Sequence, residues 1–183
     1  MKKKLILLFL MSLLPLKAFA LIEVDITRGN LNPLPLAVSP LSIDDKSKKS
    51  FEKILKKENI GSEISIIVEN NLKTSGLFNP LNKNAFLQAP DIANLKPRFE
   101  DWNLIKAQAL ITGKVTYVDE KLRVEFRLWD ILAGKEMMAL AFTTVPNNWR
   151  RVGHIISDKV YERLTGEKGY FDTRIIYVAE EGP

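Results

Sequence analysis

Three side chains near the end of the chain are of the types that catalyse hydrolysis: His154, Ser157 and Asp158. In a hydrolase triad, a histidine activates the serine and an acid orients the histidine. The segment has the apolar spacing of a helix, on which His154 and Asp158 are neighbours on one face and the serine points elsewhere. We therefore interpret His154 as a packing or hydrogen-bonding residue on a helix surface, and we expect the protein not to be an enzyme.

Composition limits the remaining chemistry. The 183 residues include no cysteine and one histidine, which excludes thiol catalysis, thiolate metal sites and sites built from several histidines. Acidic residues occur in adjacent pairs, but each pair falls in an expected turn or chain end, where a solvated role is favoured. The pairs are Asp44-Asp45, Glu100-Asp101, Asp119-Glu120 and Glu180-Glu181. We expect no catalytic residue, no cofactor and no metal ligand.

The three tryptophans separate two classes of function. We interpret Trp102, Trp129 and Trp149 as core or hinge residues. Gathered with carboxylates in one concave pocket, they would instead indicate a domain that binds or hydrolyses glycan of the cell envelope. That class is the alternative to a protein-interaction module.

An antiparallel β-meander is the clearest structural signal. Alternating apolar residues predict three strands joined by short turns. The strands are 109–118, 122–128 and 136–144, and the turns are Asp119-Glu120 and Ala133-Gly134. Earlier in the chain, prolines leave residues 36–38 as a short strand, at a sheet edge or starting after Pro35, because proline cannot donate to a strand ladder.

Two longer helices are expected to cover this sheet. The first spans about 63–75, with Ser62 as its N-terminal cap and Gly76 at its end. The second begins after Asn148 and ends at Gly166. With an extended segment at 77–81 and a last strand at 173–179, these elements predict an α/β fold. It is a mixed β-sheet with an antiparallel meander packed against two main helices.

The first twenty residues have the three-part layout of a secretory signal peptide. Lysines at 2–4 precede an apolar run at 5–16, and Ala18 and Ala20 supply the small residues that a signal peptidase reads. We expect cleavage before Leu21 and a mature protein outside the cytoplasm. A run of twelve residues rises about 18 Å as a helix, which is short for a retained anchor. We therefore expect that the protein is not an integral membrane protein.

The segment after the expected cleavage site has the period of a half-buried strand. Its apolar residues alternate with polar ones, and Gly29-Asn30 follows. The residues are Ile22, Glu23, Val24, Asp25, Ile26, Thr27 and Arg28. Such a segment can add as a strand to the sheet of a partner protein, or it can pair within its own sheet. The pattern leaves both possibilities open.

The distribution of charge bears on partners. The whole chain holds 27 basic and 22 acidic side chains, but residues 1–20 contain four lysines and no acid. The rest is therefore nearly neutral, which argues against nucleic-acid binding. A lysine-rich stretch at 44–58 is either a patch for anionic lipid or a partner, or a solvated helix face or loop, and we favour the second.

Several stretches together resemble the N-terminal domain of the TolB family. They include IEVDI at 22–26, LKTSGLFNPL at 72–81, ALITGKV at 109–115, LTGEKG at 164–169 and TRIIYV at 173–178. Further matching positions are PLAV at 35–38, Trp102, Gly153-His154 and Ser157-Asp158. Each stretch is short, but their order and spacing span nearly all of the chain after residue 20.

The resemblance implies a role in the Tol-Pal system of Gram-negative bacteria. Members of the family are periplasmic proteins with an α/β N-terminal domain and a C-terminal β-propeller, and they are not enzymes. The mature N-terminus is implicated in contact with TolA, an inner-membrane protein, and the propeller binds the lipoprotein Pal. The system supports outer-membrane integrity and constriction at cell division. These implications assign residues 22–28 to partner binding.

The expected domains follow from the same resemblance. They are a signal peptide at 1–20, an α/β domain at 21–170, and at 171–183 the start of a propeller whose remainder is absent from the sequence. Pal is then a partner only if a propeller follows. The lysine-rich stretch looks longer than is usual in the family.

Overall fold

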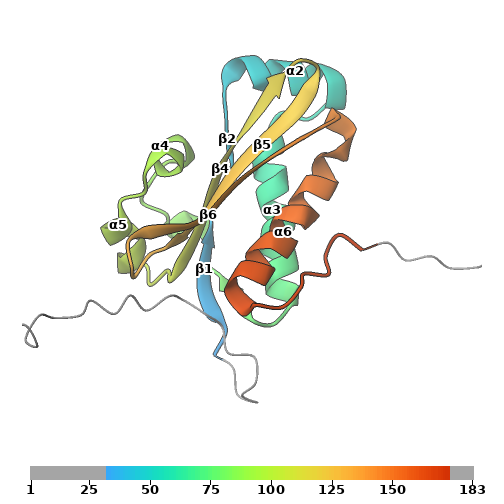
Figure 1. Ribbon diagram of the computed structural model, residues 1–183. Coiled ribbons are helices and arrows are strands. Elements are labelled where there is room, and N and C mark those ends of the chain that lie inside the picture. The colour runs from blue at the N-terminus through green and yellow to red at the C-terminus, as the bar shows by residue number, and fades with distance from the viewer. Residues whose placement is uncertain (1–31, 174–183) are drawn as a thin grey trace, which may run out of the picture.

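The structure is a computed structural model, which describes residues 32–173 (Figure 1). The expected signal peptide, the segment 22–28 and residues 174–179 of the expected last strand lie outside the described residues.

A mixed β-sheet forms the centre of the molecule. Along its main path the strand order is β3-β1-β4-β5-β6, and the two-residue strand β2 also pairs with β4. β1 is parallel to both β3 and β4, whereas β4, β5 and β6 form an antiparallel meander. The strands are β1 (Leu34–Val38), β2 (Ser42–Ile43), β3 (Phe78–Pro80), β4 (Ala109–Val118), β5 (Lys121–Asp130) and β6 (Lys135–Thr144). The predicted fold class and the predicted meander are confirmed.

Helices cover both faces of the sheet and one of its ends (Figure 1). The two long helices, α3 (Ile60–Thr74) and α6 (Trp149–Thr165), pack on one face, and α2 (Asp45–Leu55) lies across the end opposite the start of β1. The short helices α4 (Pro90–Leu95) and α5 (Phe99–Leu104) lie on the other face. Two 3-10 turns, η1 (Lys83–Ala85) and η2 (Pro146–Asn148), complete the elements.

Strand alternation divides the core into two clusters. Leu36, Val38 and Ile111 point toward α3 and α6, and they belong to the main cluster. Their neighbours Ala37 and Leu110 point the other way, into a smaller cluster beneath α4 and α5. The sheet is therefore dry on both faces at its centre.

The expectation that the strand at 36–38 is an edge strand or starts after Pro35 is wrong. β1 begins at Leu34 and lies between β3 and β4, with Pro35 inside it. The pairing of β1 with β4 begins at Leu36 and Ala109, one residue after the proline. Pro35 has no backbone N–H, but no hydrogen bond between β1 and β4 is lost, because the pairing begins after it. The Pro35 carbonyl still accepts from the backbone N–H of Gln108 at 3.0 Å.

The turns and helix ends agree largely with expectation. Asp119 and Glu120 have φ of 50° and 58°, the left-handed pair that a two-residue hairpin needs. Gly76 and Gly166, which end α3 and α6, are also left-handed. The predicted cap Ser62 is wrong: α3 starts earlier, and the Asn59 side chain accepts from the Ser62 backbone N–H at 3.1 Å.

Candidate interaction site

The expected site residues all precede the described part of the chain. These are Ala18, Ala20 and Leu21 at the expected cleavage site, and residues 22–28 as the expected partner-binding segment. The described chain begins at Asn32 and enters β1 two residues later. The Leu34 backbone N–H donates to the Leu77 carbonyl at 2.9 Å, so the chain is fixed to the sheet from this point. Any segment before Asn32 is tethered to an interior strand.

Within residues 32–173, β6 provides the longer of the two edges of the main sheet path. β3 at the other edge has three residues, whereas β6 has ten, and none of the ten is fully buried. A register shift between Leu128 and Trp129 of β5 leaves Met137 as a bulge, and Arg163 Nε donates to the Met137 carbonyl at 3.4 Å. Bulges and cationic cover restrict pairing at an edge, so the two ends of β6 differ in accessibility.

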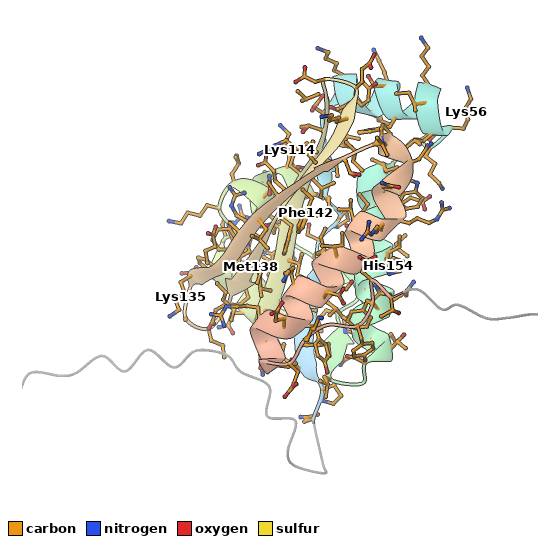
Figure 2. The ribbon with its side chains drawn as sticks, turned by 45° about the vertical axis from the view of Figure 1, so that its right-hand side comes forward. Lys56, Lys114, Lys135, Met138, Phe142 and His154 are labelled. Carbon is orange, nitrogen blue, oxygen red and sulfur yellow. The ribbon has the colours of Figure 1, made fainter. Side chains whose placement is uncertain are left out.

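A groove of about 220 Å³ runs between the end of β6 and α6. Phe142, Val152 and Ile155 supply its apolar lining, and Arg151 also lines it. Figure 2 shows Met138 and Phe142 on β6 beside α6. Arg151 also forms an ion pair with Asp172 at 3.1 Å, which raises the pKa of the Arg151 guanidinium. No local pattern in the sequence indicates this groove, because its walls come from separate elements.

His154, Ser157 and Asp158 do not form a triad. His154 Nδ1 lies 2.9 Å from the amide nitrogen of Asn71, and the same nitrogen donates to Ser157 Oγ at 3.0 Å. Ser157 is fully buried and donates to the Gly153 carbonyl. These contacts join α3 to α6, so the interpretation of His154 as a hydrogen-bonding residue is confirmed.

The Asp158 carboxylate has a different task. It accepts the backbone N–H groups of Phe171 at 2.6 Å and Asp172 at 3.1 Å. A Cβ at Gly169 would collide with Asp158, so only glycine allows the chain to pass this close. Asp158 therefore holds the segment after α6 against the helix, just beyond the predicted helix end at Gly166.

The tryptophans lie in the core, as expected. Trp102, Trp129 and Trp149 are exposed by 1%, 7% and 4%. Trp102 Nε1 donates to Gln88 Oε1 at 2.7 Å, and Trp129 Nε1 donates to Thr112 Oγ1 at 2.9 Å. None of the three rings is available as a stacking platform for sugar.

The lysine-rich stretch forms α2, with its lysines in solvent. Asp44 caps the helix by accepting the Ser47 backbone N–H at 2.9 Å, and this bond lowers the pKa of the Asp44 carboxyl. Ser47 Oγ in turn accepts the Tyr117 backbone N–H at 2.9 Å, so the helix is joined to β4. The stretch therefore contains a helix with a solvent-exposed lysine face, which both interpretations of it require.

The comparisons with known proteins identify the family. A model of the TolB amino-terminal domain matches residues 22–137. The chain belongs to the TolB amino-terminal domain family. It is also 85% identical over 177 residues to the Tol-Pal system protein TolB of Pelagibacter ubique (strain HTCC1062), covering 97% of this chain and 40% of that protein. The chain therefore spans well under half the length of this curated relative.

A solved structure agrees on the fold. TolB from Acinetobacter baumannii superposes with a TM-score of 0.60 at 21% identity, over 81% of this chain and 32% of that one. Between Asn32 and Thr173, no helix combines the length and the apolarity needed to cross a membrane. The same residues contain no group of three or more histidine, aspartate or glutamate side chains placed to hold a metal ion.

Proposed function

We propose that the protein is a periplasmic protein-interaction component of a Tol-Pal envelope system. The observation that carries this proposal is the 85% identity to a Tol-Pal system protein TolB over 97% of the chain. In this role it supports outer-membrane integrity and constriction at cell division, without enzymatic activity. Deleting the gene should release periplasmic proteins into the medium and delay constriction, and complementation with the intact gene should restore both.

Secretion is part of the proposal. Residues 1–20 act as a signal peptide that is cleaved before Leu21. The family match beginning at Ile22 supports a boundary at this position. N-terminal sequencing of the protein from the periplasmic fraction should begin at Leu21. Recovery with Met1 intact in the membrane fraction would contradict the cleavage.

Residues 22–28 form the binding segment for a TolA-like inner-membrane protein. The alternation of Ile22, Val24 and Ile26 with polar residues supports strand addition to the partner's sheet, in which backbone groups pair and alternate side chains enter pockets. The family match includes this segment. The described chain from Asn32 onward supplies a fixed base for it.

Calorimetric titration with the periplasmic part of the TolA-like protein tests the segment. Changing Ile22, Val24 and Ile26 together to serine should weaken binding by roughly a hundredfold or more, because each buried apolar side chain contributes about 1.5 kcal/mol or more. The matched control changes Glu23, Asp25 and Thr27 to serine and should lose much less. Unchanged affinity after deleting residues 22–28 would refute the assignment.

The remaining partner depends on a further domain. We propose that residues 171–183 begin a β-propeller and that a Pal-like lipoprotein binds only a chain that carries this propeller. Reading the coding sequence past Pro183 tests the first part. Pull-down of Pal with the longer and the shorter protein tests the second.

A further inference from the structure

We propose that α2 is an electrostatic docking surface for an anionic phospholipid membrane, through four lysines that we call the lysine stripe: Lys46, Lys49, Lys53 and Lys56. This proposal goes beyond the proposed function and does not rest on it. The spacing of i, i+3 and i+7 places Lys46, Lys49 and Lys53 along one side of the helix, and Lys56 is the first residue after the helix. Ser47 and Phe51 on the opposite side are buried in the protein.

The lysine stripe forms no ion pair in the described part of the chain. All four side chains are exposed, and no ion pair joins any of them to a carboxylate among residues 32–173. Their neighbour Lys57 differs, since it pairs with Glu63 at 2.9 Å and lies over the Trp149 ring. The ammonium groups of the stripe are therefore not held in an ion pair among residues 32–173 and can contact an external partner.

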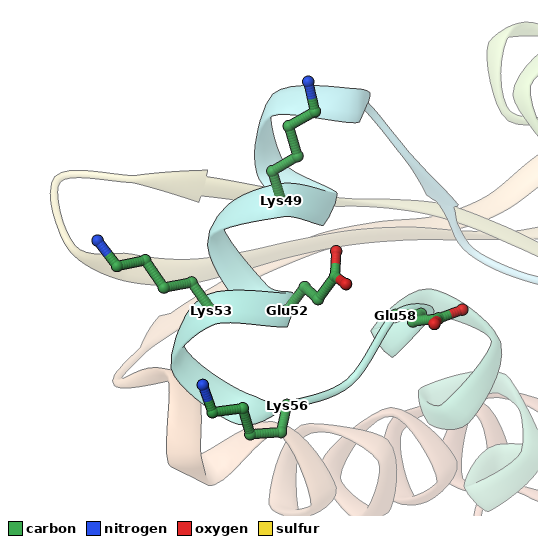
Figure 3. Close-up of a pocket in the computed structure, with 5 residues that line it drawn as sticks. All are labelled: Lys49, Glu52, Lys53, Lys56 and Glu58. Atoms are coloured by element: carbon green, nitrogen blue, oxygen red, sulfur yellow. The ribbon is translucent and has the colours of Figure 1, made fainter.

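The exposed face of α2 carries more lysines than carboxylates. From Asp45 to Lys56, five lysines and two acids are exposed, and the acids are Asp45 and Glu52. The Asp44 carboxylate is taken up by the backbone N–H and hydroxyl of Ser47. In Figure 3, Glu52 and Glu58 extend to one side, Lys53 and Lys56 extend to the other, and Lys49 extends upward. The face thus has a net positive charge, although its composition is mixed.

The helix that carries the lysine stripe is held rigidly. Ser47 bonds to the Tyr117 backbone of β4, and the Phe51 and Tyr117 rings meet edge to face with centroids 5.4 Å apart. α2 also lies at the end of the molecule opposite the start of β1, so a segment before Asn32 enters at the far end (Figure 1). A flat anionic surface can therefore approach α2 without meeting that entry point.

The composition of the lysine stripe favours a membrane over an acidic protein. The cores of protein interfaces are depleted in lysine and enriched in arginine and aromatic residues. α2 contains no arginine, whose planar fork suits carboxylates, and its exposed apolar residue is Ile54. Flexible ammonium groups attached to a fixed helix suit the diffuse charge of lipid phosphates instead.

Vesicle sedimentation tests the proposal. The stripe variant changes Lys46, Lys49, Lys53 and Lys56 to glutamine. The control variant changes four exposed lysines elsewhere, Lys73, Lys96, Lys121 and Lys168, to glutamine and so removes the same charge. All proteins share one N-terminus, confirmed by mass, so residues outside the comparison contribute equally.

The wild type should partition onto vesicles of phosphatidylglycerol and phosphatidylcholine, and not onto phosphatidylcholine alone. The stripe variant should lose roughly a hundredfold or more in partition coefficient, since each lysine contributes about fivefold, and the control variant should lose less than about tenfold. Raising the ionic strength from about 0.05 M to about 0.5 M should release the wild type. As a second check, Lys56→Gly should lose about fivefold while its urea midpoint does not fall.

Three results would overturn the proposal. One is an equal loss of vesicle binding in the stripe and control variants, which would indicate that binding depends on net charge alone. Another is absence of wild-type binding to the anionic vesicles. The third is tighter binding of the stripe to soluble polyglutamate than to the vesicles, which would indicate an acidic protein as the partner.

Discussion

At the residue scale, single polar groups connect α2 to the rest of the molecule. The Asp44 carboxylate accepts both the backbone N–H and the hydroxyl of Ser47, and that hydroxyl accepts the Tyr117 backbone N–H. A helix cap and a helix-to-sheet contact are therefore parts of one chain of hydrogen bonds. Loss of the first acceptor weakens both.

Replacing Asp44 with alanine should lower the free energy of unfolding by about 1 kcal/mol at neutral pH. The pKa of Asp44 is lowered in the folded protein, chiefly by the Ser47 backbone N–H. Its contribution is therefore present above the unfolded pKa of about 3.9 and is lost as the pH falls through the folded pKa. Urea unfolding at about pH 7 and about pH 2.5 measures the difference. Asp45→Ala is the control, and an Asp44→Ala penalty independent of pH would contradict the cause.

Replacing Lys56 with glycine should raise the free energy of unfolding by about 0.5–1 kcal/mol. Lys56 follows α2 with φ of 56°, a conformation that costs side chains with a Cβ and suits glycine. Lys53→Gly, inside the same helix, should instead lower it by about 1 kcal/mol. Urea unfolding of both variants tests whether the two changes in stability have opposite signs. If both variants are less stable than the wild type, the Lys56 side chain stabilises the folded protein through its packing.

At the element scale, the sequence predicted the strands and helices whose formation depends on neighbouring residues. The meander follows from alternation and a two-residue turn, and β4 has the predicted bounds. α3 and α6 follow from apolar spacing and a closing glycine. Pro35 misled the sequence interpretation, because whether a proline loses a bond depends on where the neighbouring strand begins. The cap at Asn59 was missed because the first apolar residue of the helix, Ile60, lies earlier than the clear repeat.

The candidate interaction site could be predicted only in part from local sequence patterns. The alternation at 22–28 is a local signal, and it remains a prediction because those residues lie outside the described part. Within residues 32–173 β6 is an edge strand, and this has no local signal, since a strand becomes an edge through what does not pair beside it. The lysine face of α2 lies between these cases: the lysine spacing is in the sequence, but the inward face is known only once Phe51 is placed.

Two glycines in the long helices should respond differently to alanine. A Cβ at Gly61 in α3 would strike the Leu41 carbonyl oxygen at 2.1 Å, whereas one at Gly153 in α6 would meet Cγ2 of Ile67 at 2.9 Å. Both changes gain about 1 kcal/mol of helix propensity. Gly61→Ala should nevertheless destabilise by about 2 kcal/mol or more, and Gly153→Ala should cost less, because its contact is longer and lies on a side chain. Thermal unfolding ranks them, and equal effects would refute the distinction.

At the scale of the whole molecule, the sheet has both faces covered at its centre within residues 32–173. The two core clusters contain residues of the sheet and of the helices on both sides. This arrangement leaves little for an earlier segment to complete. It is consistent with a separate binding role for residues 22–28, which remains a prediction.

Deleting residues 22–28 should shift the melting temperature by less than about 2 °C, well under 1 kcal/mol of stability. If the segment instead pairs within its own sheet and buries Ile22, Val24 and Ile26, the loss should be several kcal/mol. Calorimetry of the cleaved protein decides between the two. A drop above about 8 °C would favour pairing with the protein's own sheet.

The mixed sheet also sets an order of events along the chain. β4, β5 and β6 are sequence neighbours joined by short turns, so they can pair as soon as they are synthesised. β1 pairs with β3 about 40 residues later, where Leu34 meets Phe78, and with β4 about 70 residues later, where Leu36 meets Ala109. Closing so long a loop is slow compared with forming a hairpin. In a chain that leaves a channel N-terminus first, β1 therefore stays apart from β4 until most of the chain has emerged, and it joins β4 after the hairpins have formed.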